Sequence, residues 1–314
     1  MPVVRAEALA KINLGLYVLY RRLDHFHEIR TVFQTISLSD RIEVEYRRAK
    51  PRSVEITCNI PELTGDANIA SRAARLLLET ADAAGRVRVQ IEKRIPAGAG
   101  MGGGSSDAAS VLLALGSMLR PRPSFETLLR LAGIIGSDVP FFLLGGRALG
   151  LGRGEEIYPL PDGSARSAVV VAPRLQVSTA EAYRRLSPRL TEESRKGKID
   201  RFCSSVCALE PGALPGPKEG PARDLQIDLE NDFESVVFQM HPELKKVKAR
   251  LARLGARPAL LCGSGSALFG MFTDRRQALR ACDSLELEDA RSFVVRTVSR
   301  TGYRARWRKW LGGS

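Results

Sequence analysis

Residues 96–109 read PAGAGMGGGSSDAA, a segment of five glycines and two serines with the composition of a phosphate-binding loop. Glycine has no Cβ, so a glycine-rich backbone can turn sharply, adopt positive φ angles and lie against an anion. The backbone N–H groups of such a loop then bind the phosphate oxygens. The residues expected in this cradle are Pro96, Ala97, Gly98, Ala99, Gly100, Met101, Gly102, Gly103, Gly104, Ser105 and Ser106.

The segments on either side predict that this loop connects a strand to a helix. Residues 87–91 alternate apolar and polar side chains, which is the pattern of a half-buried strand. Residues 108–119 have apolar side chains at helical spacing, so Ser105, Ser106 and Asp107 fall in the first turn. The N-terminus of a helix favours a bound phosphate. A flexible glycine linker is the structural alternative, but a linker needs neither flanking element.

Two common phosphate loops do not fit this segment. A Walker A loop has lysine directly before its serine or threonine, whereas Gly104 precedes Ser105. A dinucleotide-binding loop has an acidic residue about 20 positions further on, where this chain has Arg120, Arg122 and Pro123. The segment instead resembles the second motif of the GHMP kinases, a family of small-molecule kinases. In that family the loop wraps the ATP phosphates, and its serines help to hold phosphate and Mg²⁺.

Two further segments resemble motifs of the same family, in the family's order. AKINLGLYV, residues 10–18, resembles the first motif, and LLCGSGSALFG, residues 260–270, resembles the third. The resemblance implies an ATP-dependent phosphotransferase of the GHMP kinase fold, an α+β fold of two α/β domains with the active site in the cleft between them. We expect the domains to span residues 1–163 and 164–314.

The acceptor is implied by a closer resemblance to one subfamily. Residues 10–34 resemble the opening of the GHMP kinases that phosphorylate the 2-hydroxyl of a cytidine-diphosphate-linked alcohol, 4-diphosphocytidyl-2-C-methyl-D-erythritol, in non-mevalonate isoprenoid synthesis. The segments GSDVPFF, VSTAEAY, ENDFE and CGSGS resemble the same subfamily. Substrate-binding roles are therefore expected for Asn13, Thr179, Gly263, Ser264 and Gly265. The alternatives are a homoserine or mevalonate type of GHMP kinase and, outside enzymes, an RNA-binding protein.

The resemblance implies that Asp138 is the catalytic base and Lys11 its partner. An alcohol is a poor nucleophile at neutral pH, so a nearby carboxylate can orient the hydroxyl and accept its proton. An ammonium beside the carboxylate keeps it ionised and offsets charge on the transferred group. Without the resemblance, Asp138 would be interpreted as a turn or N-cap aspartate, and Lys11 as a solvated lysine at a strand edge.

The subfamily binds cytosine through aromatic residues and a histidine, which correspond to Phe26, His27 and Tyr183. A base stacked between Phe26 and Tyr183 gains about 1–3 kcal/mol per contact, and His27 can read its polar edge. Without the resemblance, the two aromatic residues would be interpreted as residues of the hydrophobic core, and His27 as a structural histidine. Where the subfamily has Gly-Tyr-His, this chain has His25, Phe26 and His27, so a tyrosine hydroxyl is missing.

The adenine of ATP is implied to lie near Asn68, Ile69 and Lys93. Asn68 is equally explained as a helix N-cap, and Lys93 as a charge at the end of a strand. Phosphoryl transfer requires Mg²⁺, but the sequence contains no recognisable carboxylate cage for a metal.

Composition predicts an ordinary enzyme in the cytoplasm. The chain has 314 residues and a formal net charge of +13, and it contains no apolar run of about 20 residues that could span a bilayer. The N-terminus lacks the apolar core of a signal peptide. Because the charge is spread along the chain, we expect no nucleic acid and no membrane as a partner. We expect the protein to be a monomer or a weak homodimer. The basic residues 304–309 are expected to form a solvated, peripheral end of the chain with a tryptophan packed back on the domain.

Other elements follow from local patterns. We predict a strand pair or a strand and turn over residues 3–20, strands at 41–46, 53–58 and 167–173, and helices at 69–84, 125–132 and 241–254. Residues 259–272 are predicted to form a strand, a glycine turn and a second strand. Residues 187–225 are rich in proline and charge and are predicted to be a long surface insertion.

Overall fold

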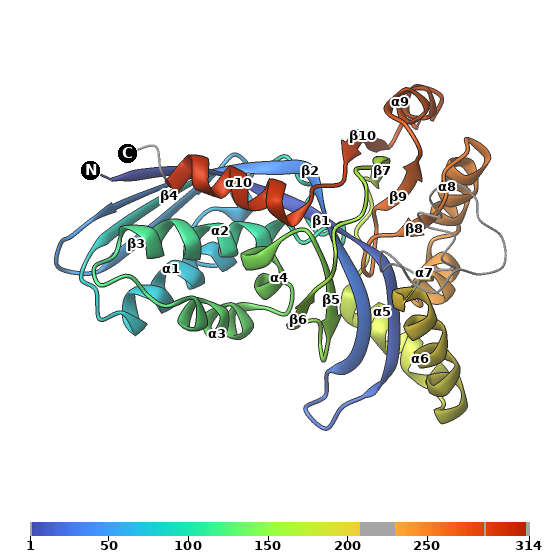
Figure 1. Cartoon of the computed structure of the whole chain (residues 1–314), viewed down its shortest axis with the longest axis horizontal. Coiled ribbons are helices and arrows are strands. Elements are labelled where there is room, and N and C mark those ends of the chain that lie inside the picture. Colours follow the sequence, from blue (N-terminus) through green and yellow to red (C-terminus); the bar gives the residue numbers. More distant parts are fainter. Residues whose placement is uncertain (1, 208–229, 286, 312–314) are drawn as a thin grey trace.

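The computed structural model describes residues 2–207, 230–285 and 287–311. Its strands form two separate sheets, each with its own helices (Figure 1). The first sheet has the strand order β3-β4-β2-β5-β6, and β1 pairs with β2 outside this path. Its strands are β1 (Val3–Arg21), β2 (His27–Arg47), β3 (Ser53–Cys58), β4 (Arg86–Glu92), β5 (Arg147–Leu151) and β6 (Glu156–Pro159).

Four helices lie on one face of the first sheet, with α3 packed on the other three (Figure 1). They are α1 (Ile69–Thr80), α2 (Gly103–Met118), α3 (Phe125–Ile135) and α4 (Val139–Leu144). The central helix, α2, buries nearly every residue from Ser106 to Gly116, as expected of a helix that is surrounded by other elements. The glycine loop is therefore fixed at its far end by one of the most buried helices of the molecule.

The second sheet is antiparallel, with the order β10-β7-β9-β8. Its strands are β7 (Ser167–Pro173), β8 (Ala259–Leu261), β9 (Leu268–Phe272) and β10 (Ala290–Arg296). Helices α5 (Thr179–Leu186), α6 (Glu192–Cys207), α7 (Glu234–Met240), α8 (Pro242–Arg253) and α9 (Arg275–Asp283) lie around it. The expected α+β class is confirmed, while the division at residue 163 stays a prediction.

The long hairpin of β1 and β2 connects the two sheets. β1 is a single strand of 19 residues, so the expected strand pair within residues 3–20 was wrong. Beyond the first sheet, isolated bridges pair Leu16 with Asn231 and Ile36 with Thr297. The hairpin thus carries residues of the first motif from one sheet to the other.

Two other local predictions need correction. α1 ends at Thr80 rather than near Gly85, because Asp82 has a positive φ of 43° just after it. Part of the expected surface insertion is the helix α6, which buries Lys198, Phe202 and Ser205. Residues 208–225 of that prediction lie outside the described residues.

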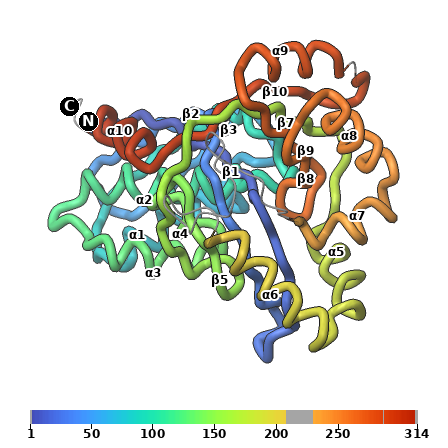
Figure 2. Tube along the Cα trace, turned by 45° about the vertical axis from the view of Figure 1, so that its right-hand side comes forward, coloured from blue at the N-terminus to red at the C-terminus, as the bar shows by residue number. Residues whose placement is uncertain are grey.

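The basic C-terminal segment is not a solvated tail, although the expected packing of a tryptophan on the domain is confirmed. It forms the helix α10 (Arg300–Leu311), which lies beside β1 and close to the N-terminus (Figure 2). Tyr303 and Trp307 are buried, whereas Arg304 and Arg308 point outward. The sequence prediction missed the spacing of four between the two aromatic residues, which places them on one helix face. No described helix is long and apolar enough to cross a membrane.

Candidate active site

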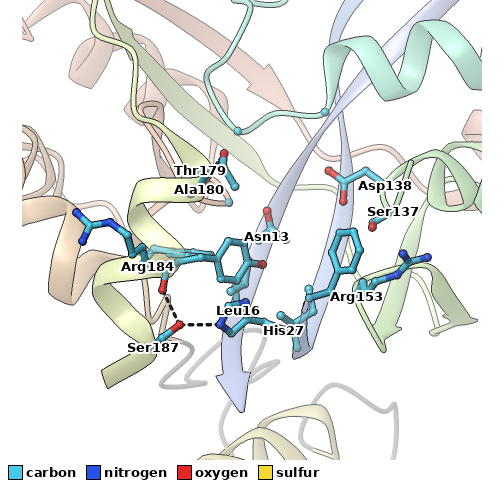
Figure 3. A pocket seen from close by; sticks show the side chains of 18 of the residues that line it. Asn13, Leu16, His27, Ser137, Asp138, Arg153, Thr179, Ala180, Arg184 and Ser187 are labelled. Atoms are coloured by element: carbon cyan, nitrogen blue, oxygen red, sulfur yellow. Dashed lines mark hydrogen bonds between the residues drawn. The ribbon is translucent and has the colours of Figure 1, made fainter. Parts of the chain in front are cut away.

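A cleft of about 1030 Å³ opens between the glycine loop, the β1–β2 hairpin and α5 (Figure 3). It is large for a ligand pocket, as two substrates would require. The predicted site residues that line it are Lys11, Asn13, Phe26, His27, Gly100, Gly102, Ser105, Asp138, Thr179, Tyr183, Gly263 and Ser264. The fold therefore brings residues from all three motifs to one cavity.

The glycine loop ends at Gly102, the N-cap of α2, with a φ of 68°. No side chain of the described part of the chain caps this helix start, and its first N–H groups have no intrahelical partners. Ser105 lines the cleft. Ser106 does not, because its hydroxyl is buried and donates to Leu9 O at 2.7 Å. The expectation that Ser106 holds phosphate through its hydroxyl is therefore corrected.

The glycine loop lies directly against the CGSGS turn of the third motif. Ala267 N donates to Ala99 O at 3.2 Å. Gly100 has a φ of 78°, and a Cβ at this position would lie only 2.0 Å from Cys262 O. A side chain at Gly100 would separate the two turns, so glycine is required by the contact. Within this turn, Ser264 Oγ hydrogen-bonds Thr179 Oγ1 at 2.8 Å.

Irregular pairing between β1 and β2 directs Lys11 and Asn13 into the cleft. The register shifts between Leu9 and Lys11 and again between Asn13 and Gly15. Such bulges change the direction in which a side chain points. Lys11 Nζ donates to Asn13 Oδ1 at 2.7 Å, and Asn13 Nδ2 donates to Thr31 Oγ1 at 2.8 Å.

Lys11 and Asp138 form an ion pair, with Nζ 3.4 Å from Oδ2. Asp138 occupies the N-cap position of α4, but its side chain makes no capping hydrogen bond. The turn interpretation thus accounts for its backbone and not for its carboxylate. The Lys11 side chain is 4% exposed and that of Asp138 is 31% exposed. Lys11 is therefore not a solvated strand-edge lysine, and the carboxylate is accessible from the cleft.

Phe26 stands at the tip of the β1–β2 hairpin with 52% of its surface exposed. It is not a core residue. The guanidinium of Arg153 lies over its ring, 4.7 Å from the centroid. Arg153 is itself fixed by Glu155, since its Nε donates to Oε1 at 3.0 Å. One face of Phe26 is thus covered by a cation.

His27 and Tyr183 stack on each other, with ring centroids 4.6 Å apart and an interplanar angle of 17°. Phe233 contacts Tyr183 edge-on. The expected sandwich of a base between Phe26 and Tyr183 is therefore corrected, because His27 covers that face of Tyr183. Burial, with a contribution from the charge of Asp138, raises the pKa of Tyr183.

Ser187 fixes the proton position on His27 (Figure 3). Its hydroxyl donates to Tyr183 O at 2.9 Å, so it accepts from His27 Nε2, which lies 2.8 Å away. Burial, and then the charge of Arg21, lowers the pKa of His27. At neutral pH the ring is accordingly neutral, with the proton on Nε2 and an acceptor lone pair on Nδ1.

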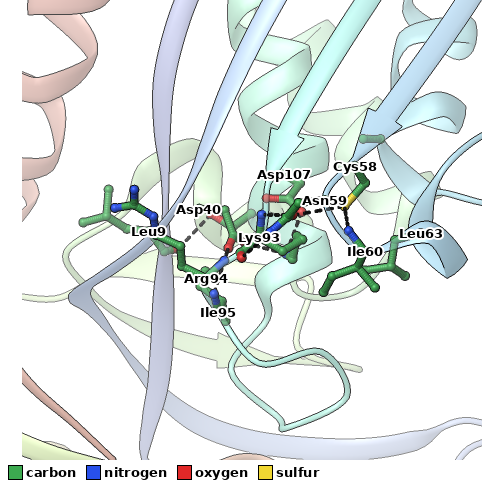
Figure 4. Close-up of polar contacts among 12 residues, drawn as sticks. Leu9, Asp40, Cys58, Asn59, Ile60, Leu63, Lys93, Arg94, Ile95 and Asp107 are labelled. Carbon is green, nitrogen blue, oxygen red and sulfur yellow. Dashed lines mark hydrogen bonds and ion pairs between the residues drawn. The ribbon is translucent and has the colours of Figure 1, made fainter. Parts of the chain in front are cut away.

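Two of the three residues expected near adenine use their side chains in contacts within the protein. Asn68 caps α1, accepting from Ala70 N and donating to Leu63 O at 2.7 Å. Lys93 is buried and its ammonium pairs with Asp40 and Asp107 (Figure 4), and its position near adenine stays a prediction. Ile69 is near the loop, since a Cβ on Gly104 would lie 3.6 Å from its Cγ2.

Arg153 and Ser187 were not predicted from the sequence. Each contacts a predicted residue across a long stretch of chain, and neither lies in a distinctive motif. Asp107 was detectable in part, because a carboxylate among the buried residues of an apolar helix requires a charged partner.

Comparisons with known proteins agree with this geometry. Residues 68–146 match the GHMP kinases N terminal domain, and residues 218–289 match the GHMP kinases C terminal domain. The chain is 47% identical to a 4-diphosphocytidyl-2-C-methyl-D-erythritol kinase of Solibacter usitatus, with 96% of this chain and 91% of that protein covered.

Two solved structures are similar over almost the whole chain. A 4-(cytidine 5'-diphospho)-2C-methyl-D-erythritol kinase has a TM-score of 0.71 and 37% identity, covering 93% of this chain and 98% of that one. A homoserine kinase from Cytophaga hutchinsonii has a TM-score of 0.70 at 18% identity, covering 95% of each chain. The second likeness concerns the fold alone.

Proposed function

The chain belongs to the GHMP kinases and, among them, to the 4-diphosphocytidyl-2-C-methyl-D-erythritol kinases, and from this membership we propose its reaction. It transfers the γ-phosphate of ATP to the 2-hydroxyl of 4-diphosphocytidyl-2-C-methyl-D-erythritol, a step of non-mevalonate isoprenoid synthesis. The observation that supports the proposal best is the ion pair of Lys11 and Asp138, in a cleft shared with the glycine loop and the Phe26–His27 tip of the hairpin.

Asp138 acts as the base in this proposal. Its carboxylate orients the acceptor hydroxyl and takes its proton as the oxygen–phosphorus bond forms. Lys11, which Asn13 holds in place, pairs with the carboxylate and would offset negative charge on the transferred phosphoryl group. The protein contributes mainly the positioning of the substrates and the stabilisation of charge, because phosphoryl transfer requires little covalent chemistry from the enzyme.

The glycine loop fits a nucleoside triphosphate. Its positive φ angles at Gly98, Gly100 and Gly102 curve the backbone, and the N-terminus of α2 favours an anion. Mg²⁺ fits if the phosphates supply most of its ligands, because the described residues hold no cluster of three or more metal-binding side chains. The Ser105 hydroxyl is the protein group that would help to hold it. When bound, Mg²⁺ neutralises charge on the phosphates.

The cytosine of the acceptor would lie against Phe26 and His27. Arg153 covers one face of Phe26, which leaves the other for the base. The lone pair on His27 Nδ1 suits the amino group of cytosine, a hydrogen-bond donor. Stacking on Phe26 does not depend on the tyrosine hydroxyl that this chain lacks.

A panel of acceptors tests this function. ATP consumption is measured with the cytidine-linked alcohol, homoserine and mevalonate, and free CDP is then added as a competitor. Turnover with the first acceptor alone, inhibited by CDP, is the expected result. ATP consumption with homoserine or mevalonate that CDP does not inhibit would refute the proposed acceptor. It would still agree with a GHMP kinase.

A further inference from the structure

The buried amide of Asn231, in the ENDFE segment, connects parts of the chain that meet at the cleft. Asn231 comes shortly before α7 and is 3% exposed. Its side chain makes three hydrogen bonds, all to backbone groups. Nδ2 donates to Leu261 O at 2.9 Å and to Gly263 O at 2.7 Å, and Oδ1 accepts from Phe233 N at 3.0 Å. The amide thus uses both of its donors, as a buried polar group should.

Two of these bonds hold the CGSGS turn of the third motif. Leu261 is the last residue of β8, and Gly263 lies in the turn that follows it. The Leu261 N–H group is held by the first residue of α7, since it donates to Glu234 Oε1 at 2.9 Å. The start of the turn is therefore fixed from outside, by Asn231 and by α7.

The backbone around Asn231 pairs with β1, the strand that carries the first motif. Leu16 N donates to Glu230 O at 2.8 Å, and Asp232 N donates to Leu16 O at 3.0 Å. Leu16 itself lines the cleft. Asn231 therefore fixes the third motif relative to the strand of the first motif.

The turn that Asn231 holds lies beside Lys11 and the glycine loop. A Cβ on Gly263 would lie 3.5 Å from Lys11 Nζ and 3.1 Å from Gly100 O. A misplacement of about 1 Å can cost about 100-fold in rate. The position of this turn therefore matters for the ammonium that pairs with Asp138.

Packing alone does not require an amide at this position. An apolar side chain could fill the space, whereas a polar group with every partner satisfied specifies one arrangement of the backbone around it. The neighbouring Asp232 offers a comparison. Its carboxylate accepts from Val18 N and pairs with Lys198, each at 2.7 Å, so it fastens β1 to α6. Asn231 and Asp232 thus connect β1 to different elements.

We propose that Asn231 is a positioning residue for phosphoryl transfer, which acts by holding the third-motif turn against Lys11 and the glycine loop. The inference rests on the proposed function, in which Lys11 takes part in the reaction. Asn231 is buried behind the cleft-lining residues of the described structure, so it acts through them. Loss of its two donated bonds frees the turn and leaves the glycine loop attached to α2.

The reactivity of Lys11 in the free protein tests the positioning without any substrate. Its side chain is 4% exposed, so acetic anhydride should acetylate it slowly, as measured by mass spectrometry of peptides from the full chain. In Asn231→Ala the turn can open, and the acetylation rate of Lys11 should rise severalfold. The matched control Asp232→Asn removes the ion pair of Lys198. Lys198 should then become more reactive, while Lys11 keeps the wild-type rate.

The kinetic consequence is measured with ATP and the cytidine-linked alcohol. We expect Asn231→Ala to lower kcat about 100-fold, while the Kd for a non-hydrolysable ATP analogue stays close to that of the wild type. Asp232→Asn should keep the wild-type kcat. A second variant, Asn231→Asp, keeps the size of the side chain and the bond from Phe233 N but lacks the two N–H donors. Its loss of kcat should match that of Asn231→Ala.

Each outcome decides for or against the positioning role. Unchanged reactivity of Lys11, or an unchanged kcat, in a folded Asn231 variant would overturn it. Equal losses in Asn231→Ala and Asp232→Asn would do so as well, because they would reflect a general loss of stability. If neither Asn231 variant folds, Asn231 is a requirement of the fold and the inference is wrong. If Lys11 becomes reactive as expected but the wild type phosphorylates no acceptor, the proposed function fails and the positioning of Lys11 stands.

Discussion

At the scale of single residues, the backbone around Lys11 and Asp138 decides what their side chains can do. Lys11 points into the cleft because β1 is irregular on both sides of it. Asp138 has the position of a helix cap without the capping bond. Neither feature can be read from residue types, which is why the sequence alone left a turn aspartate and a strand-edge lysine as alternatives.

Asp138→Asn should abolish most of the turnover and leave ATP binding close to normal. The amide keeps the shape of the side chain but cannot accept the proton of the alcohol, and general-base catalysis contributes about 100- to 10,000-fold. Steady-state kinetics give kcat, and titration with a non-hydrolysable ATP analogue gives Kd. Asp82→Asn, at an exposed carboxylate after α1, serves as the matched control. A kcat equal to that of the wild type would remove Asp138 from the mechanism.

Phe26→Ala should raise the KM for the cytidine-linked alcohol about tenfold and leave the KM for ATP unchanged. The reason is the loss of one stacking contact, worth about 1–3 kcal/mol. Phe125 offers a matched control, because it is 49% exposed and lies on α3, outside the cleft. Equal increases in both KM values would contradict a stacking role for Phe26.

At the scale of elements, local patterns predicted the strand, loop and helix around the phosphate cradle. They did not reveal the buried ion pairs of Lys93, because Asp40 lies far from Lys93 and Asp107 in the sequence. Burial and pairing depend on tertiary packing, which a periodicity of side chains does not encode. α6 and α10 were missed for a related reason, since charged residues on their outer faces mask a small buried face.

The pH dependence of stability should report on Asp107. A free aspartate has a pKa of about 3.9, whereas burial raises the pKa of Asp107 to about 8 in the folded chain. The neutral carboxyl favours the folded state fully below about pH 4, and this contribution is lost as the pH rises towards 8. Asp107→Asn lacks the titration. Relative to the wild type, its free energy of unfolding should therefore gain about 1 kcal/mol or more between pH 5 and pH 8.

Urea denaturation at the two pH values measures this difference. Exposed carboxylates titrate alike in both proteins and cancel in the comparison. The same change in unfolding free energy for wild type and variant would mean that Asp107 is already ionised at neutral pH.

The anchoring of α10 predicts a large loss on removing its central aromatic side chain. Trp307 is 7% exposed and packs with Tyr303 against β1. Trp307→Ala should lower the free energy of unfolding by about 3–5 kcal/mol. Trp310→Ala, which alters a half-buried tryptophan three residues on, should cost much less. Equal small losses in denaturant unfolding would mean that α10 is peripheral, as the sequence first indicated.

At the scale of the whole molecule, the β1–β2 hairpin connects the two sheets and lines the cleft. Its base belongs to the first sheet, and its far half contacts Asn231 and the helices of the second. The three motifs were expected to converge because they resemble those of a known family. The sequence provides no distances, so it could not show that His27 stacks on Tyr183 or that Arg153 covers Phe26.

The identity of the product tests the central claim most directly. Wild-type protein, ATP, Mg²⁺ and 4-diphosphocytidyl-2-C-methyl-D-erythritol are incubated, and the product is examined by mass spectrometry and phosphorus NMR, with Asp138→Asn in parallel. The account predicts one added phosphoryl group on the 2-hydroxyl, formed by the wild type and almost absent with the variant. Unchanged acceptor, or a phosphate attached at another oxygen, would contradict it.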